Sequence, residues 1–102
     1  ENINFETYAD GTEADSKNYI SKVDGTIENS MLKYDVEYRT DIANAKFYVA
    51  VYDDRGNVVA ISDKNRDNIN IKNESKSYTI KAVLWNRNLK PLCNVESKTV
   101  ER

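Results

Sequence analysis

One stretch of the chain, residues 63–74, carries oxygen-bearing side chains at the spacing of a calcium-binding loop. Asp63, Asn65 and Asp67 occupy the first, third and fifth positions of such a loop, and Glu74 occupies the twelfth. Carboxylate and amide oxygens are the ligands that Ca²⁺ prefers at these positions. The four residues are therefore the weak metal-site candidate of this sequence.

Other features of the same stretch oppose calcium binding. The sixth position, where the loop needs glycine for a sharp turn, is Asn68, and two basic residues reduce the local negative charge. The alternation from Asn68 to Lys72 favours a short exposed strand, which would hold Glu74 away from Asp63. We therefore expect a polar loop and strand here, with no bound metal and no cofactor.

No other set of residues points to catalysis. The chain has no histidine, so its single cysteine, Cys93, lacks the usual base partner of a nucleophilic thiol. We expect Cys93 to be a buried structural thiol. Asp53 and Asp54 are adjacent in a turn, where acidic residues cap the backbone, and Tyr78 is placed to form a structural tyrosine corner. The sequence predicts a protein that is not an enzyme.

The elements around these residues are strands. From Leu32 to Arg39, apolar and polar residues alternate without interruption. Period two puts alternate side chains on one face of a strand, whereas a helix would scatter them. The face that we expect to be buried consists of Leu32, Tyr34, Val36 and Tyr38.

Two further segments predict central strands. Residues 46–52 are apolar on both faces, which is typical of a strand inside a sheet. Gly56 in the following turn can adopt the left-handed conformation of a type I turn with a bulge, so residues 58–61 return antiparallel. Residues 78–85 form the next strand, with Tyr78, Ile80, Ala82 and Leu84 on its core face.

The remaining segments give weaker signals. A turn at residues 86–88 precedes a last strand from Leu89 to about Val100, in which Pro91 predicts an edge or a bulge. Near the N-terminus, Ile3 and Phe5 could start a strand, and the pairs Asp10-Gly11 and Asp24-Gly25 indicate turns. About seven short strands without a long amphipathic helix predict an all-β antiparallel sandwich that occupies residues 1–102 as a single domain.

If the core faces are as assigned, the outer face of the central strands gathers aromatic side chains. The candidate binding residues on this face are Tyr48, Tyr52, Val83 and Trp85. Such a strip could stack on sugar rings or dock a protein. A loop or a neighbouring domain could instead cover it, or the faces could be reversed, with Trp85 in the core.

Charge and hydropathy exclude two classes of partner. The chain carries 15 basic and 17 acidic residues, so it has no basic surface for nucleic acid. No apolar run is long enough for membrane insertion. The chain begins with Glu1 and shows no signal peptide, so we expect it to be a domain excised from a longer protein.

Two segments carry a family resemblance. Val49–Val58 and Tyr78–Cys93, above all Leu84-Trp85 followed by Lys90-Pro91-Leu92, resemble an Ig-like or fibronectin-III-like module. That module is appended to secreted and cell-surface multidomain proteins of anaerobic Gram-positive bacteria. The resemblance implies an Ig-like sandwich, an extracellular or cell-surface location, and a non-catalytic accessory role.

The resulting hypothesis is a structural spacer or protein-interaction module of a secreted bacterial protein, whose partners are neighbouring domains of the same chain. One alternative is a carbohydrate-binding module that stacks polysaccharide on Tyr48, Tyr52 and Trp85. Another is an adhesin-type domain that binds a surface protein of a host.

Overall fold

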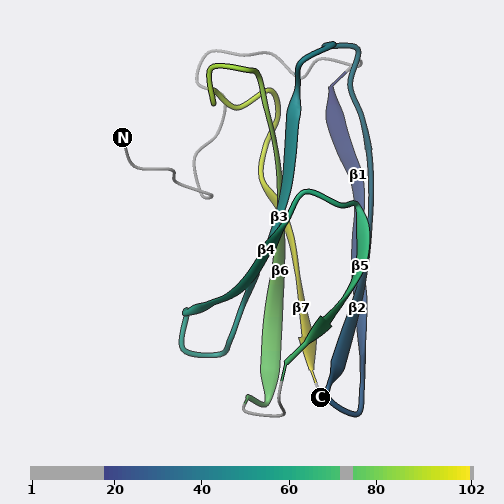
Figure 1. Cartoon of the computed structure of the whole chain (residues 1–102), viewed down its shortest axis with the longest axis vertical. Coiled ribbons are helices and arrows are strands. Elements are labelled where there is room, and N and C mark those ends of the chain that lie inside the picture. The colour runs from purple at the N-terminus through teal and green to yellow at the C-terminus, as the bar shows by residue number, and fades with distance from the viewer. Residues whose placement is uncertain (1–17, 72–74, 102) are drawn as a thin grey trace.

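The computed structural model describes residues 18–71 and 75–101. Within these ranges the chain is all-β, with seven strands in two antiparallel sheets and no helix (Figure 1). The three-stranded sheet has the order β1-β2-β5, and the four-stranded sheet has the order β4-β3-β6-β7. The strands are β1 (Tyr19–Glu28), β2 (Met31–Arg39), β3 (Lys46–Tyr52), β4 (Val58–Ser62), β5 (Arg66–Asn70), β6 (Ser77–Trp85) and β7 (Glu96–Glu101).

The core lies between the two sheets, and alternate side chains of the strands point into it. On β2, Leu32, Tyr34 and Val36 are buried, as predicted. Tyr38, the fourth residue of this set, is 38% exposed because it lies near the end of the strand, where its ring stacks on Phe47 at a centroid distance of 4.1 Å. The other large contributors to this cluster are Val49, Val51, Ile71, Tyr78, Ile80, Leu84 and Val100.

The hairpin between β3 and β4 has the predicted geometry. The Gly56 N–H donates to the Asp53 carbonyl at 3.2 Å, and the Asp53 N–H donates to the Asn57 carbonyl at 2.9 Å. Gly56 has φ +85°, a left-handed conformation that glycine adopts without steric cost. The Asp53 carboxylate accepts from the N–H groups of Asn57 and Arg55, and these bonds hold the pKa of Asp53 below its usual range. The predicted turn and its acidic cap are both confirmed.

The prediction of a turn at Asp24-Gly25 is wrong, because both residues lie inside β1. A bulge between Ile20 and Lys22 shifts the register of this strand, so period-two alternation does not run through it. A side chain at Gly25 would collide with Ile80 on the facing sheet. The glycine is therefore explained by close packing of the sheets rather than by a turn.

The last strand is shorter than predicted. β7 begins at Glu96, and Pro91 makes only an isolated bridge to Trp85 before it. Pro91 cannot donate to a strand ladder, so continuous pairing begins only after it. The strand predicted at 68–72 begins and ends two residues earlier in the structure, where β5 spans Arg66–Asn70. Ile3, Phe5 and the pair Asp10-Gly11 lie outside the described residues.

The Gly25→Ala variant should be less stable than the parent chain by about 1–3 kcal/mol, the usual cost of overpacking a core. The new methyl group would meet Ile80, the Lys33 carbonyl oxygen at 3.2 Å and Val100 Cγ2 at 3.2 Å. Urea unfolding followed by Trp85 fluorescence measures the change. Thr26→Ala, on the exposed side of the same strand, is the matched control, and an equal effect of the two variants would contradict the close-packing explanation.

Candidate functional site

The candidate aromatic strip lies on the outer face of β3 and β6, as predicted. Tyr48 pairs with Val83 across the two strands, and Lys46 pairs with Trp85. The rings of Tyr48 and Trp85 are 5.6 Å apart and tilted by 55°. Trp85 is absent from the cluster between the sheets, so the reversed arrangement, with Trp85 in the core, is wrong.

The strip is not an open platform. Trp85 and Val83 are only 4% and 1% exposed, whereas Tyr48 and Tyr52 are half-buried. The Lys81 ammonium group lies over the Tyr52 ring, 5.0 Å from its centroid, in a cation–π contact. Burial also raises the pKa of Tyr52 above its usual value. Stacking on a sugar needs an accessible ring face, and the largest ring of the strip does not offer one.

Two of the four candidate calcium residues, Asn65 and Asp67, are engaged in sheet structure. The Asn65 amide donates to the Val36 carbonyl at 3.3 Å, and the Asn65 carbonyl accepts from the Val36 N–H at 2.8 Å. Asp67 lies within β5, where its carboxylate accepts from the Asn68 N–H. Asp63 is exposed in the connection between β4 and β5. Glu74 lies outside the described residues, and those that are described contain no cluster of three metal-binding side chains.

The phenol and the thiol have structural environments. The Tyr78 hydroxyl donates to the Ile71 carbonyl at 3.1 Å and accepts from the Ser75 N–H at 3.2 Å, which confirms the tyrosine corner. Cys93 is half-buried against the core, and desolvation together with the Glu96 charge raises the pKa of its thiol to about 11. At neutral pH this thiol is protonated and therefore a poor nucleophile.

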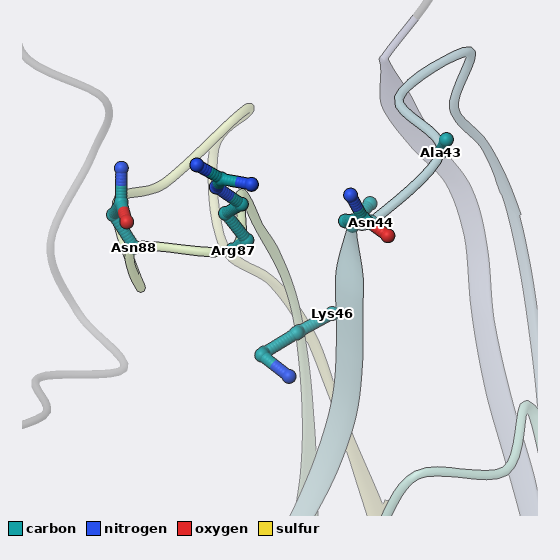
Figure 2. Close-up of a pocket in the computed structure, with 6 residues that line it drawn as sticks. Ala43, Asn44, Lys46, Arg87 and Asn88 are labelled. Carbon is teal, nitrogen blue, oxygen red and sulfur yellow. The ribbon is translucent and has the colours of Figure 1, made fainter.

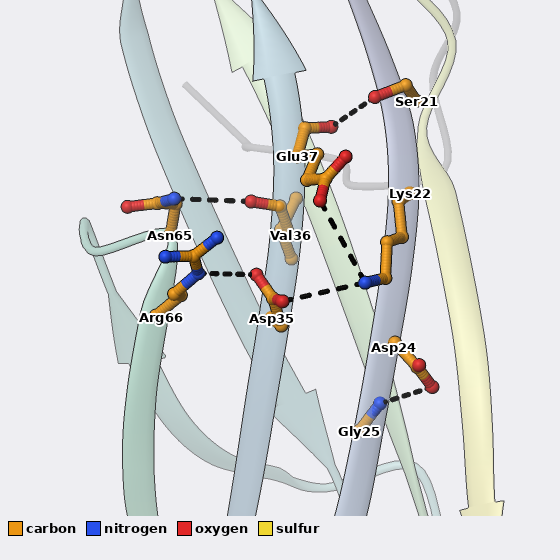
Figure 3. A network of polar contacts seen from close by, with 9 residues as sticks. All are labelled: Ser21, Lys22, Asp24, Gly25, Asp35, Val36, Glu37, Asn65 and Arg66. Atoms are coloured by element: carbon orange, nitrogen blue, oxygen red, sulfur yellow. Dashed lines mark hydrogen bonds and ion pairs between the residues drawn. The ribbon is translucent and has the colours of Figure 1, made fainter.

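The outer face of the three-stranded sheet is polar and solvated (Figure 3). Asp35 on β2 lies between Arg66 at 2.8 Å and Lys22 at 3.6 Å, and Lys22 also approaches Glu37 at 3.9 Å. The hydrogen bond from Arg66 holds the pKa of the Asp35 carboxyl below its usual range. These ion pairs are exposed, so each contributes little to stability. The partly exposed carboxylates of Asp35 and Glu37 lie on an open sheet and line no cleft for acid–base chemistry.

Within the described part of the chain, two open hollows lie at opposite ends of the central strands β3 and β6. One, of about 390 Å³, is lined by Tyr52, Lys81 and the β3–β4 turn. The other, of about 720 Å³, lies between residues 43–46 and the tip of the β6–β7 turn (Figure 2). We call the second one the basic hollow, because among the described residues that line it only Lys46 and Arg87 are charged. Sequence reasoning missed it, since its two sides are about forty residues apart in the chain.

The turn that presents Arg87 is held rigidly. The Asn86 side-chain oxygen accepts from the N–H groups of Asn88 at 2.8 Å and Lys90 at 3.1 Å, which repeats the role of Asp53 in the β3–β4 turn. The Leu89 N–H donates to the Asn86 carbonyl at 2.9 Å. Leu89 has φ +63°, where the equivalent position of the other turn is a glycine. A β-carbon is strained in this conformation.

Comparison of the sequence with protein-family models and with curated proteins finds no match. The described parts of the chain also contain no helix with the length and apolarity that crossing a bilayer requires.

Leu89→Gly should raise the free energy of unfolding by about 1 kcal/mol, because it removes a left-handed strain and loses little burial. Gly56→Leu is the reciprocal variant and should lower the free energy of unfolding by a similar amount, because a β-carbon is strained at the Gly56 φ of +85°. No atom lies within 4 Å of the new β-carbon, so no contact would offset this strain. Urea midpoints of both variants measure the effect. A destabilised Leu89→Gly chain, or an unchanged Gly56→Leu chain, would show that the turns do not impose this conformation.

Proposed function

We propose that this domain is a non-catalytic accessory module, a spacer or protein-interaction unit of a secreted or cell-surface multidomain protein, and that its sandwich is of the Ig-like or fibronectin-III-like type. The observation that carries the proposal is the strand arrangement β1-β2-β5 and β4-β3-β6-β7 together with the Tyr78 corner. A tyrosine whose hydroxyl bonds to the backbone before its strand is a hallmark of such sandwiches. The resemblance in residues 49–58 and 78–93 supports the same type.

The surfaces support a role without chemistry. Both hollows are open, and the Asp35 carboxylate is partly exposed and paired with Lys22 and Arg66. A spacer needs a stable core and polar exterior rather than a cleft. The described part of this domain has both features.

The carbohydrate-binding alternative is weaker. It requires Trp85 as a stacking surface, and that side chain is 4% exposed. Only Tyr48 and Tyr52 retain partial access, and Lys81 already lies over the Tyr52 ring. No observation on the described surfaces favours the adhesin alternative over a contact with neighbouring domains.

Affinity electrophoresis of the full chain in gels that contain soluble β-glucan, xylan or galactomannan tests the proposal. A spacer or protein-interaction module should migrate as it does in a plain gel. Retention by a polysaccharide that Tyr48→Ala or Trp85→Ala abolishes, in variants with an unchanged far-ultraviolet spectrum, would refute the proposal and support glycan binding.

A further inference from the structure

The basic hollow is lined by two cations that have no counter-charge among the described residues. Lys46 lies at the start of β3 and Arg87 at the tip of the β6–β7 turn, and neither forms an ion pair with a described residue. Elsewhere on the sandwich, Lys22 and Arg66 are matched to carboxylates. The local excess of positive charge is notable because the whole chain has a net charge of −2.

Two amide side chains complete the lining. Asn44 and Asn88 lie on opposite sides of the hollow, and Lys46 leaves β3 toward the side of the turn (Figure 2). Neither amide side chain has a hydrogen-bond partner among the described residues. Ammonium, guanidinium and amide groups are all donors, so N–H groups line both sides of the hollow. The carboxylates of the other turn, at Asp53 and Asp54, belong to the other hollow.

We propose that the basic hollow binds carboxylate groups of an acidic protein segment. A carboxylate offers two acceptor oxygens to a guanidinium group and can accept from an ammonium or amide group at the same time. Bound there, it would also offset positive charge that no described carboxylate balances. The inference rests on the proposed function, because it names the partner of an interaction module as an acidic segment of a neighbouring or separate protein.

The surroundings of the hollow favour a peptide over an acidic sugar. Trp85, which pairs with Lys46 across β3 and β6, is buried and so cannot stack on a sugar. The two loops instead expose aliphatic side chains next to the lining residues, with Ile42 40% exposed beside Ala43 and Leu89 46% exposed beside Asn88. Acidic residues interspersed with apolar ones would match this surface.

The turn is already ordered for binding. The Asn86 side-chain oxygen holds the backbone through two hydrogen bonds, from the N–H groups of Asn88 and Lys90. The Leu89 conformation is retained although it is strained, and backbone strain of this kind often accompanies binding sites. A rigid turn reduces the ordering cost of binding for Arg87.

Titration of the full chain with a short oligoglutamate peptide, followed by calorimetry at low ionic strength, tests the proposal. We expect saturable binding that weakens as salt rises, because exposed charges are screened. The double variant Lys46→Gln, Arg87→Gln should weaken binding roughly tenfold or more. The control double variant Lys33→Gln, Arg55→Gln also removes two positive charges, but from exposed sites outside the hollow. We expect it to change the affinity for the peptide less than roughly twofold.

Each other outcome has a defined meaning. Equal weakening of oligoglutamate binding by both double variants would show that binding depends on net charge alone, and would overturn the assignment of the hollow. A parent chain that does not bind the peptide would overturn it as well. In both cases the spacer function would stand. Binding of polygalacturonate that depends on Lys46 and Arg87, with no binding of oligoglutamate, would overturn the inference and the proposed function together. Thermal unfolding of both double variants controls for loss of fold.

Discussion

The two sheets of this sandwich bury their facing sides against each other, and every other feature depends on that contact. Leu32 and Val36 on β2 share one apolar cluster with Ile80 and Leu84 on β6. Removal of such side chains from water is the main stabilising term available to a domain of this size. The packing is close enough that Gly25 cannot carry a side chain without displacing Ile80. Because the inner faces are buried in the core, only the outward side chains and the loops are accessible for contacts with other molecules.

Much of this arrangement could be predicted from the sequence, because alternation reports directly on burial. The regular pattern of β2 and the turn at Gly56 each follow from local physical rules, namely period two and the left-handed preference of glycine. The role of Tyr78 was also predictable, since a tyrosine at the start of such a strand can reach the backbone before it. Local signals sufficed wherever the residues of one strand or one turn decide the outcome.

The failures arose where tertiary contacts decide. β1 contains a bulge after Ile20, which breaks its periodicity. Gly25 in this strand is required by close packing against the opposite sheet and not by a turn. The burial of Trp85 cannot be read from a strand pattern, because an outward position says nothing about what covers it. The basic hollow is likewise a product of tertiary structure, since Lys46 begins β3 and Arg87 lies in the β6–β7 turn. Interaction surfaces of sandwich domains often join segments in this way, because their loops gather at the ends of the sheets.

Amide hydrogen exchange of the full chain tests the central claim, which is that β3 and β6 form the inner pair of a buried sheet. Both strands have a hydrogen-bonded neighbour on each side, whereas β4 and β5 lie at sheet edges. We expect the slowest amides at the middle of β3 and β6, near Val49 and Ile80, where exchange requires global unfolding, and faster exchange along β4 and β5. Amides of β6 that exchange as fast as those of β5 under the same conditions would contradict the two-sheet account.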